Sequence, residues 1–218
     1  MSLSELWSLY GQNYIDALLA TWGMTLESFA IAMVLAVAVT VMRVSPLKPL
    51  RVFGDLYVQV FRNIPGIALL IIVYALPPLK VVLPYRTCVI VATVLLGSAF
   101  GSENFMSGIN TVGVGQVEAA RSLGMSFSRI LAKIVIPQAL RSSVLPMSNL
   151  FIAVMLTTAL GSQVPLKPQE LTGVVSYINT RSLGGVAAFF ISALGYLGTA
   201  FVVSHIGNYI DKKVRILR

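Results

Sequence analysis

Charged residues are scarce in this sequence. They make up 11% of its 218 residues, whereas a soluble globular domain carries roughly 25%. Apolar residues account for 56% of the chain and occur in runs long enough to cross a lipid bilayer. This composition excludes an ordinary soluble domain. The sequence predicts one membrane domain, residues 1–218, with several spans and no separate soluble part.

Cysteine and histidine are almost missing, since Cys88 and His205 are the only residues of their kinds. A lone cysteine permits no disulfide within the chain, and the sequence holds no Cys/His cluster that would predict a metal site. His205 lies deep in the last apolar run, where a packed or interfacial role is favoured over a proton relay. The sequence also lacks a catalytic triad, and its GVGQ stretch lacks the Lys and Ser/Thr of a phosphate-binding loop. We therefore expect no catalytic residues and no ATP hydrolysis by this chain.

The N-terminal segment lacks the basic region and the small-residue cleavage site of a secretory signal peptide. We expect no removable leader, and the first span serves for targeting. Apolar residues before this span fall near helical spacing, and Trp7 and Trp22 are available as interfacial anchors. The pattern favours a short helix lying in the headgroup region over a binding role.

A spanning helix needs about 20 mostly apolar residues, and the sequence contains five candidates. The second contains Arg62, Asn63 and Pro65, which are unusual in a span, and the fourth is interrupted by Pro146. The fifth is rich in Gly and Ala, which favour close helix packing in lipid. The predicted spans are Trp22–Met42, Phe53–Leu76, Tyr85–Met106, Ala139–Gln163 and Gly184–Tyr209.

Positive charges orient this predicted bundle. Eleven of the sixteen Lys and Arg residues fall in segments that five spans place on one side of the membrane, and Arg62 lies within the second span. By the positive-inside rule, the C-terminus is cytoplasmic and the N-terminus is external. The eleven are Arg43, Lys48, Arg51, Arg121, Arg129, Lys133, Arg141, Lys212, Lys213, Arg215 and Arg218, and the four on the opposite side are Lys80, Arg86, Lys167 and Arg181.

The longest predicted cytoplasmic stretch, residues 108–139, is too structured for a plain connector. Residues 116–123 favour a helix, and Gly124 follows where a helix often ends in a residue with positive φ. Ser126 is placed to cap a second helix with an apolar stripe, and Pro137 ends or bends that helix. From physical chemistry alone, either a surface helix that orders the loop or a docking element for a partner fits this pattern.

The residues of this stretch resemble a known motif. Glu118, Ala119 and Ala120, then Arg121 and Gly124, followed by the dipeptide that ends in Pro137, are similar to the EAA loop of bacterial ATP-binding-cassette (ABC) importer permeases. In that family, the loop, here residues 108–137, forms a coupling helix that seats in a cleft of a cytoplasmic ATPase.

The resemblance extends from about residue 14 to residue 210. It includes the strings YIDALLATWGMTL and VMRVSP around the first span, FRNIP in the second, and GQVEAARSLG, IPQALR and PMSNLFI further on. These strings are similar to the polar amino-acid uptake branch. RVSPLK and SGINTVGVGQVEAARSLG are most similar to actinobacterial glutamate-type permeases.

The resemblance implies an all-α type I ABC importer permease in the bacterial cell membrane. It implies a polar amino acid, such as glutamate, glutamine or aspartate, as substrate, delivered by an external binding protein. The implied partners are two cytoplasmic ATPase subunits, which use ATP and Mg²⁺, and a second permease. No nucleic acid is implied as a partner, and no cofactor is implied on this chain.

Arg62 and Glu103 are ionisable residues at predicted membrane depth, where such groups usually face a partner or a cavity. They form an ion pair between two helices, or Glu103 is simply hydrated near the cytoplasmic side, or both line a translocation path. Asn63 and Pro65 are expected to unwind the second span locally. The resemblance implies that the segment from Arg62 to Pro65 and a polar segment of the fourth span line this path. With the reading that places Glu103 on the path, the candidate path residues are Arg62, Asn63, Pro65, Glu103, Thr157 and Thr158.

The sequence departs from the family pattern near these residues. Leu156 stands where the family has Lys, Ala159 where it has a small hydroxyl residue, Met106 where it has Arg, and Pro165 where it has Gly. A heterodimer, in which another permease makes most substrate contacts, or a less charged substrate explains these departures, and we favour the heterodimer.

Other classes of membrane protein are disfavoured. A gradient-driven carrier or small channel is the main alternative, but the chain has one intramembrane carboxylate and no inverted repeat. A sensor or scaffold without transport has no need of polar residues such as Arg62 and Thr157 along a path.

Overall fold

The computed structural model describes residues 3–75, 83–181 and 185–214, and these residues form helices and connecting turns only. Lys80, Arg215 and Arg218, three of the charges used above for orientation, lie outside the described residues. The elements are α1 (Leu3–Val44), α2 (Lys48–Asn63), α3 (Gly66–Tyr74), α4 (Tyr85–Asn110), α5 (Val114–Ser122), α6 (Phe127–Ile130), the π-helical turn η2 (Leu131–Val135), α7 (Ile136–Ser142), α8 (Val144–Thr157), the 3₁₀ turn η3 (Thr158–Gln163), α9 (Leu171–Asn179) and α10 (Gly185–Val214).

The all-α membrane architecture is confirmed. Among the described residues, four helical stretches are long and apolar enough to span a bilayer. A fifth span is possible only as the bent pair α2 and α3, whose axes differ by 103°. The predicted second span, Phe53–Leu76, is therefore interrupted where the sequence predicted local unwinding, because the chain turns sharply at Ile64 and Pro65.

The first helix also differs from its prediction. We expected a separate surface helix before the first span, but α1 is one helix of 42 residues. Its N-terminal part does not lie alone, because Leu6 and Tyr14 are buried against α9 and α10. Tyr14 also donates a hydrogen bond to the carbonyl oxygen of Ala188 at 3.0 Å. These contacts extend the helix beyond its spanning part.

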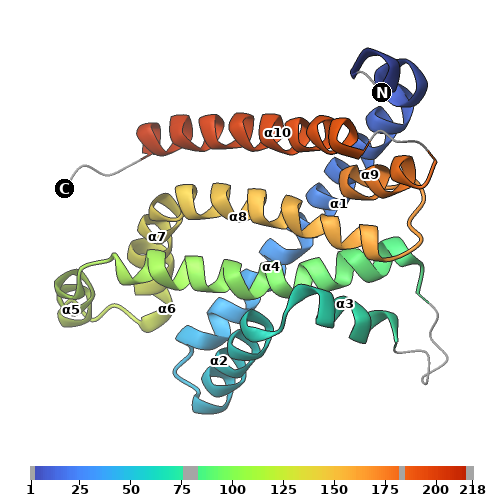
Figure 1. Cartoon of the computed structure of the whole chain (residues 1–218). Helices are drawn as coiled ribbons and strands as arrows, with labels where there is room; N and C mark the ends of the chain where they lie inside the picture. The colour runs from blue at the N-terminus through green and yellow to red at the C-terminus, as the bar shows by residue number, and fades with distance from the viewer. Residues whose placement is uncertain (1–2, 76–82, 182–184, 215–218) are drawn as a thin grey trace.

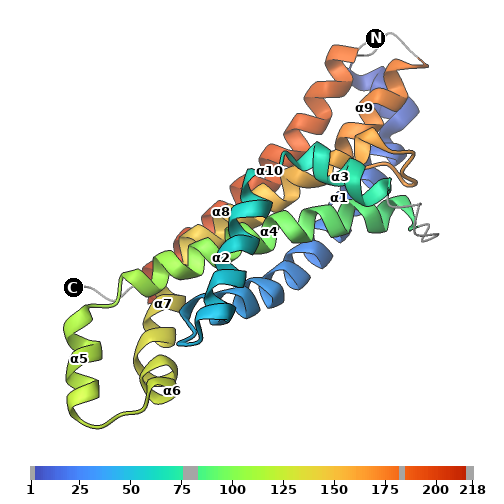
Figure 2. The same ribbon diagram turned by 90° about the horizontal axis from the view of Figure 1, so that it is seen from below.

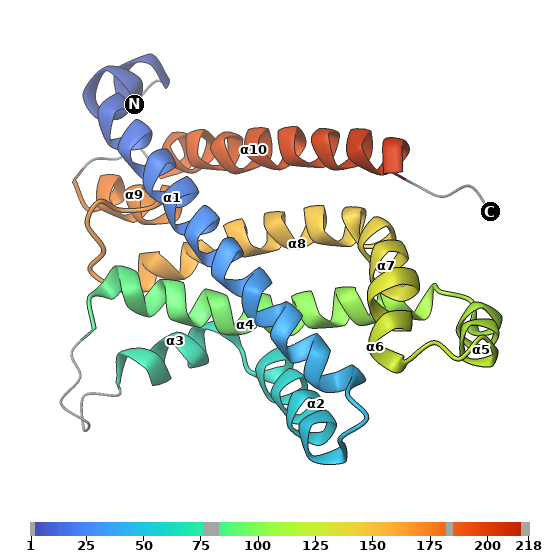
Figure 3. The same ribbon diagram turned by 180° about the vertical axis from the view of Figure 1, so that it is seen from behind.

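The helices form an elongated bundle. In Figure 1, α4, α8 and α10 lie side by side, and Figure 3 shows α1 crossing their other face diagonally. Figure 2 shows the N- and C-termini toward opposite ends of the long axis, with α5 and α6 at the C-terminal end. The segments that carry most of the positive charge lie toward this same end.

Small residues allow α1 and α4 to approach closely. Gly97 and Gly101 of α4 face Ala32 and Ala36 of α1, and each pair has the spacing i, i+4. Helices in lipid gain stability from close packing rather than from hydrophobic burial, so small residues at this spacing are favoured. This interface fixes the helix that carries Glu103.

Large apolar side chains cover the outside of the bundle. Phe189, Leu194, Leu197 and Phe201 of α10 are each more than 60% exposed. In water such a surface would be unfavourable. In a bilayer, it contacts lipid or another apolar helix.

Candidate translocation site and coupling loop

The break between α2 and α3 is the first feature of the site. Pro65 has no N–H and disfavours helical backbone in the residue before it, and Ile64 is extended, with φ −83° and ψ 128°. The helix resumes when the N–H of Leu69 donates to the oxygen of Pro65 at 3.0 Å. Asn63 lies in the last turn of α2, and its side-chain amide donates to the carbonyl oxygen of Gln59. The predicted local unwinding is therefore present.

A cavity of about 650 Å³ opens beside this break. It lies between the α2–α3 break, α4 and the α8–η3 segment, and Arg62 is the only charged residue among the described residues of its lining. Its other polar side chains belong to Thr157 and Gln163. The lining residues are Arg62, Ile64, Gly66, Ile67, Leu96, Phe100, Leu156, Thr157, Ala159, Leu160 and Gln163.

Arg62 and Glu103 are in contact. Nη1 of Arg62 lies 3.4 Å from Oε2 of Glu103, and the Arg62 guanidinium lies over the ring of Phe100 at 5.4 Å. Oε2 of Glu103 also accepts a hydrogen bond from Nη1 of Arg43 at 3.1 Å. Arg43 in turn pairs with Asp55 at 2.9 Å. Four alternating charges thus link α1, α2 and α4, with Arg62 at the cavity.

The two threonines of the fourth span lie differently. Thr157 lines the cavity, and its hydroxyl donates to the carbonyl oxygen of Ala153 at 2.8 Å. Thr158 is fully buried, is not part of the lining, and donates to the carbonyl oxygen of Met155. Of the predicted path residues, the structure places Arg62 and Thr157 on the cavity wall, Asn63 and Pro65 at the adjoining break, and Glu103 behind Arg62.

The predicted turn at Gly124, in the segment that resembles the EAA loop, is present. Gly124 has φ +73°, and its N–H donates to the oxygen of Arg121 at 2.9 Å. The N–H of Met125 donates to the oxygen of Ala120 at 3.1 Å. These two bonds form a Schellman motif, which ends a helix and favours glycine. A sharp reversal therefore follows α5.

The loop has an outer and an inner side. Glu118 and Ala119 are exposed, whereas Ala120 is buried with Val112, Ile130 and other apolar residues in a small separate core. Ala120 therefore packs inside the loop and does not contribute to its outer side. This core makes the loop a rigid unit rather than a loose connector.

Pro137 does not end the second loop helix. The chain forms the π-helical turn η2 just before it, and the N–H of Ile136 donates to the oxygen of Leu131, five residues back. A wider turn at this place accommodates a residue that lacks an N–H. The helix then continues to Ser142, and the direction changes there, before α8.

Comparison with known proteins identifies the architecture. Residues 28–216 match the family model described as "binding-protein-dependent transport system inner membrane component". The chain belongs to this family. It is a multi-pass permease subunit of an ABC importer, located in the inner membrane, and ATP hydrolysis takes place in a separate subunit.

Several curated relatives align over most of the permease. It is 33% identical to the glutamate transport system permease protein GluC of Corynebacterium efficiens, over 89% of this chain and 91% of the relative. It is 32% identical to the L-cystine transport system permease protein TcyB of Bacillus subtilis, over 95% and 91%. It is 31% identical to the probable glutamine ABC transporter permease protein GlnM of Bacillus subtilis, over 97% and 96%.

Solved structures share the fold. A crystal structure of an amino acid ABC transporter with histidines superposes with a TM-score of 0.91, covering 98% of this chain and 99% of the other at 24% identity. An inward-facing structure of the MetNI methionine ABC transporter gives a TM-score of 0.73, covering 99% and 100% at 19% identity. At these identities, the likeness concerns the fold.

Two of the departures from the family pattern lie on the cavity wall of the permease. Leu156 and Ala159 both line it, so the lining is apolar at two positions where family members are expected to be polar, beside the polar Thr157 and Gln163. Met106 lies on α4, and Pro165 follows η3. Neither is part of the lining.

Glu170 is a residue that the sequence reasoning missed. It is completely buried, and its carboxylate accepts hydrogen bonds from the N–H groups of Thr172 and Gly173 and from the hydroxyl of Tyr196. Burial raises the pKa of this carboxyl, and the three hydrogen bonds oppose that rise. The signal in the sequence was an acidic residue just before a helix, where it caps the first N–H groups.

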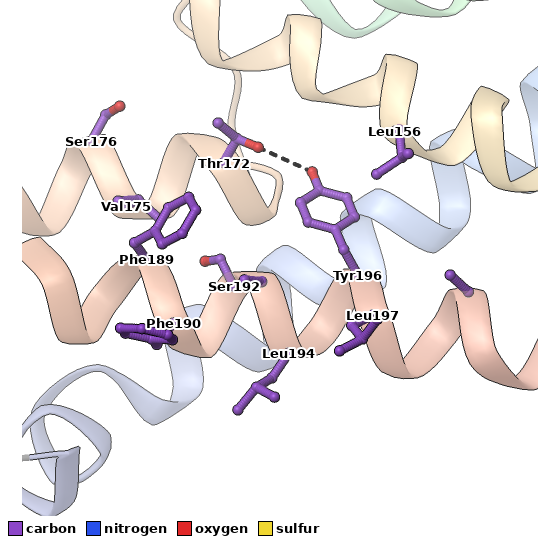
Figure 4. Close-up of a pocket in the computed structure, with 12 residues that line it drawn as sticks. Leu156, Thr172, Val175, Ser176, Phe189, Phe190, Ser192, Leu194, Tyr196 and Leu197 are labelled. Carbon is purple, nitrogen blue, oxygen red and sulfur yellow. Dashed lines mark hydrogen bonds between the residues drawn. The ribbon is translucent and has the colours of Figure 1, made fainter.

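Thr172 and Tyr196, which hydrogen-bond to Glu170, line a second cavity of about 700 Å³ (Figure 4). Side chains of α9 and α10 form most of its wall, and the hydrogen bond between Thr172 and Tyr196, 3.2 Å long, crosses between these helices. Leu156 lines this cavity as well as the one that holds Arg62. None of the described residues that line the second cavity is charged.

Proposed function

We propose that this permease translocates a polar amino acid of the glutamate, glutamine or aspartate kind, received from an external binding protein. Relatives at 31–33% identity are named for glutamate, cystine and glutamine transport. All three compounds carry an α-carboxylate. The proposal therefore concerns recognition of the α-carboxylate first, and recognition of the amino acid's side chain second.

The observation that carries the proposal is Arg62 in the wall of the 650 Å³ cavity. A guanidinium presents a planar set of N–H donors that matches a carboxylate in two parallel hydrogen bonds. The cavity adjoins the α2–α3 break, where the helix is unwound at Ile64 and Pro65. Irregular backbone at membrane depth is tolerated where it borders such a cavity.

Coupling to the ATPase is assigned to residues Glu118–Gly124. The segment lies at one end of the bundle, with Glu118 and Ala119 exposed and the Schellman turn holding α5 in place. A closing ATPase dimer can move the membrane helices only through a rigid element that it grips. α5 directly follows α4, so a force on it is transmitted to the helix that carries Glu103.

The proposed assembly contains two ATPase subunits and a second permease. A paralogue is favoured over a second copy, because the apolar wall at Leu156 and Ala159 leaves few polar contacts for a substrate in this chain. The C-terminus is assigned to the cytoplasm and the N-terminus to the outside.

A pull-down tests the assembly. The tagged permease is purified from native membranes in mild detergent, and its partners are identified by mass spectrometry and an ATPase assay. We expect a stoichiometric ATPase, lost in Glu118→Ala and Gly124→Asp variants, and a second permease in the same eluate. This chain alone, without ATPase activity, would contradict the proposed coupling and favour a gradient-driven carrier or a channel.

Transport is then measured with the same complex in proteoliposomes. Uptake of labelled glutamate and glutamine should require both ATP and the cognate binding protein. Uptake that persists without ATP would contradict the proposed function.

A further inference from the structure

The contact between Glu103 and Arg62 is weak by its geometry. A single oxygen, Oε2, serves two guanidinium groups, at 3.1 Å from Arg43 and 3.4 Å from Arg62. The side chains of Glu103 and Arg62 are 40% and 37% exposed. An ion pair that is partly exposed and shares its acceptor contributes little stability.

Arg43 holds Glu103 independently of Arg62. The Arg43 side chain is only 12% exposed, and it is fixed by Asp55 at 2.9 Å and by the hydroxyl of Ser102 at 3.3 Å. If Arg62 turned away, Glu103 would still have a charged partner. The arrangement therefore allows Arg62 to exchange its partner without leaving a carboxylate unpaired.

Contacts other than the Arg62–Glu103 pair also hold α2 against α4. The hydroxyls of Tyr57 in α2 and Ser98 in α4 are hydrogen-bonded at 2.7 Å. Val58 of α2 is buried at 1% exposure. A purely structural role would thus be redundant for this pair.

We propose that Glu103 is a resident competitor for the substrate's carboxylate. It occupies Arg62 while the cavity is empty, and it is displaced onto Arg43 alone when a carboxylate enters. This inference rests on the proposed function and adds a specificity residue to it. In this exchange, Arg62 loses one contact to Glu103 and gains two parallel hydrogen bonds to the carboxylate of the ligand. Only a ligand with a carboxylate therefore gains affinity from the exchange.

This competition predicts that the affinity for a carboxylate rises, rather than falls, when Glu103 loses its charge. Removing the charge in Glu103→Gln should make carboxylate binding tighter, whereas loss of a residue that contacts substrate or supports the fold makes it weaker. A partly exposed ion pair is worth up to about 1 kcal/mol, so we expect the Kd to fall about two- to fivefold.

The test measures binding of tritiated L-glutamate and L-glutamine to the complex purified through a tag on this chain, without binding protein. Glu27→Gln is the matched control, because Glu27 pairs with Arg86 at 2.7 Å with similar exposure and neither residue lines the cavity. Glu103→Asp is a second variant, since its shorter side chain withdraws from Arg62 and keeps its charge. An analogue with its carboxylates amidated is used as a competitor.

Tighter binding in both Glu103 variants, unchanged Kd in Glu27→Gln and no competition by the amidated analogue would support the inference. An unchanged or raised Kd in both Glu103 variants would overturn it, as would wild-type complex that binds neither amino acid. Failure of the proposed function is seen separately, as wild-type proteoliposomes that show no ATP-dependent uptake with the binding protein present.

Discussion

Gly101 of α4 lies so close to Ala36 of α1 that a Cβ built on Gly101 would be 2.9 Å from the Cβ of Ala36. It would also lie 2.9 Å from Cε of Met33. Both helices would have to separate to admit a larger side chain. Since α4 carries Glu103 and α1 carries Arg43, this separation would also disturb the ion pairs beside the cavity.

We therefore expect Gly101→Val to destabilise the permease by about 1–3 kcal/mol, as overpacking of a close interface does. The measurement is the thermal unfolding midpoint of the purified complex in detergent. Gly198→Val is the matched control, because a Cβ at Gly198 meets no atom within 4 Å. Equal midpoints for the two variants would show that the α1–α4 approach is not a stabilising feature.

Gly124→Asp is expected to leave membrane insertion intact and to abolish ATP-dependent uptake. The residue has φ +73°, which costs a residue with a Cβ about 1–2 kcal/mol, and the added charge alters the surface proposed to meet the ATPase. Proteoliposome uptake and the yield of inserted protein are measured together.

The Gly113→Asp variant separates the effect of disturbing the turn at Gly124 from the effect of the added charge. Gly113 lies at the start of α5 with φ −61°, and a Cβ at this position, as at Gly124, meets no atom within 4 Å. We expect this variant to keep most of its uptake. Wild-type uptake in Gly124→Asp would refute the coupling assignment, and loss in both variants would assign the effect to charge rather than to the turn.

Arg62→Gln should weaken binding of L-glutamate about ten- to hundredfold, because hydrogen bonds to a charged group are worth about 1.5–3 kcal/mol. ATPase co-purification should not change, since Arg62 lies in α2 and not in the α5–α7 loop. Equilibrium binding to the purified complex measures the effect. Arg86→Gln, which removes the arginine of another partly exposed ion pair, serves as control, and equal affinity in both variants would exclude Arg62 as the carboxylate site.

Glu170→Ala should destabilise the permease by about 2 kcal/mol, because it leaves two helix N–H groups and the Tyr196 hydroxyl without their acceptor. Tyr196→Phe, which removes one of these three bonds, should cost about 1 kcal/mol. The thermal unfolding midpoints of the two variants show which of them is less stable. A midpoint for Glu170→Ala at or above that of Tyr196→Phe would contradict the role of the carboxylate as a cap.

Features fixed by backbone preferences of a few neighbouring residues could be predicted from the sequence. Gly124 was expected to have positive φ, and it does, because glycine alone adopts this conformation without a steric cost. The break at Pro65 follows from the missing N–H in the same way. The size of the bend, 103°, did not follow, since it depends on the packing of α3 against α4 and α1.

Features that depend on distant parts of the chain could not be predicted. Oε2 of Glu103 meets Arg43 across 60 residues of sequence, whereas Arg62 was the one charged partner that the sequence suggested for Glu103, as one of three alternatives. Likewise, Tyr196 reaches Glu170 from another helix. No local pattern reports such contacts, because they arise when whole helices pack.

The sequence by itself determined that this is a membrane protein of apolar helices, where the turn at Gly124 lies and where the second span is interrupted. The length of an apolar run and the positions of glycine and proline act on the backbone locally, so the amino-acid sequence suffices to predict these three features. The tertiary structure alone decided that α1 continues to Leu3, that Ala120 faces inward, and that one carboxylate oxygen lies between two arginines. These depend on how closely the helices approach, and small residues at Gly97, Gly101 and Ala36 set that distance only after the bundle has formed.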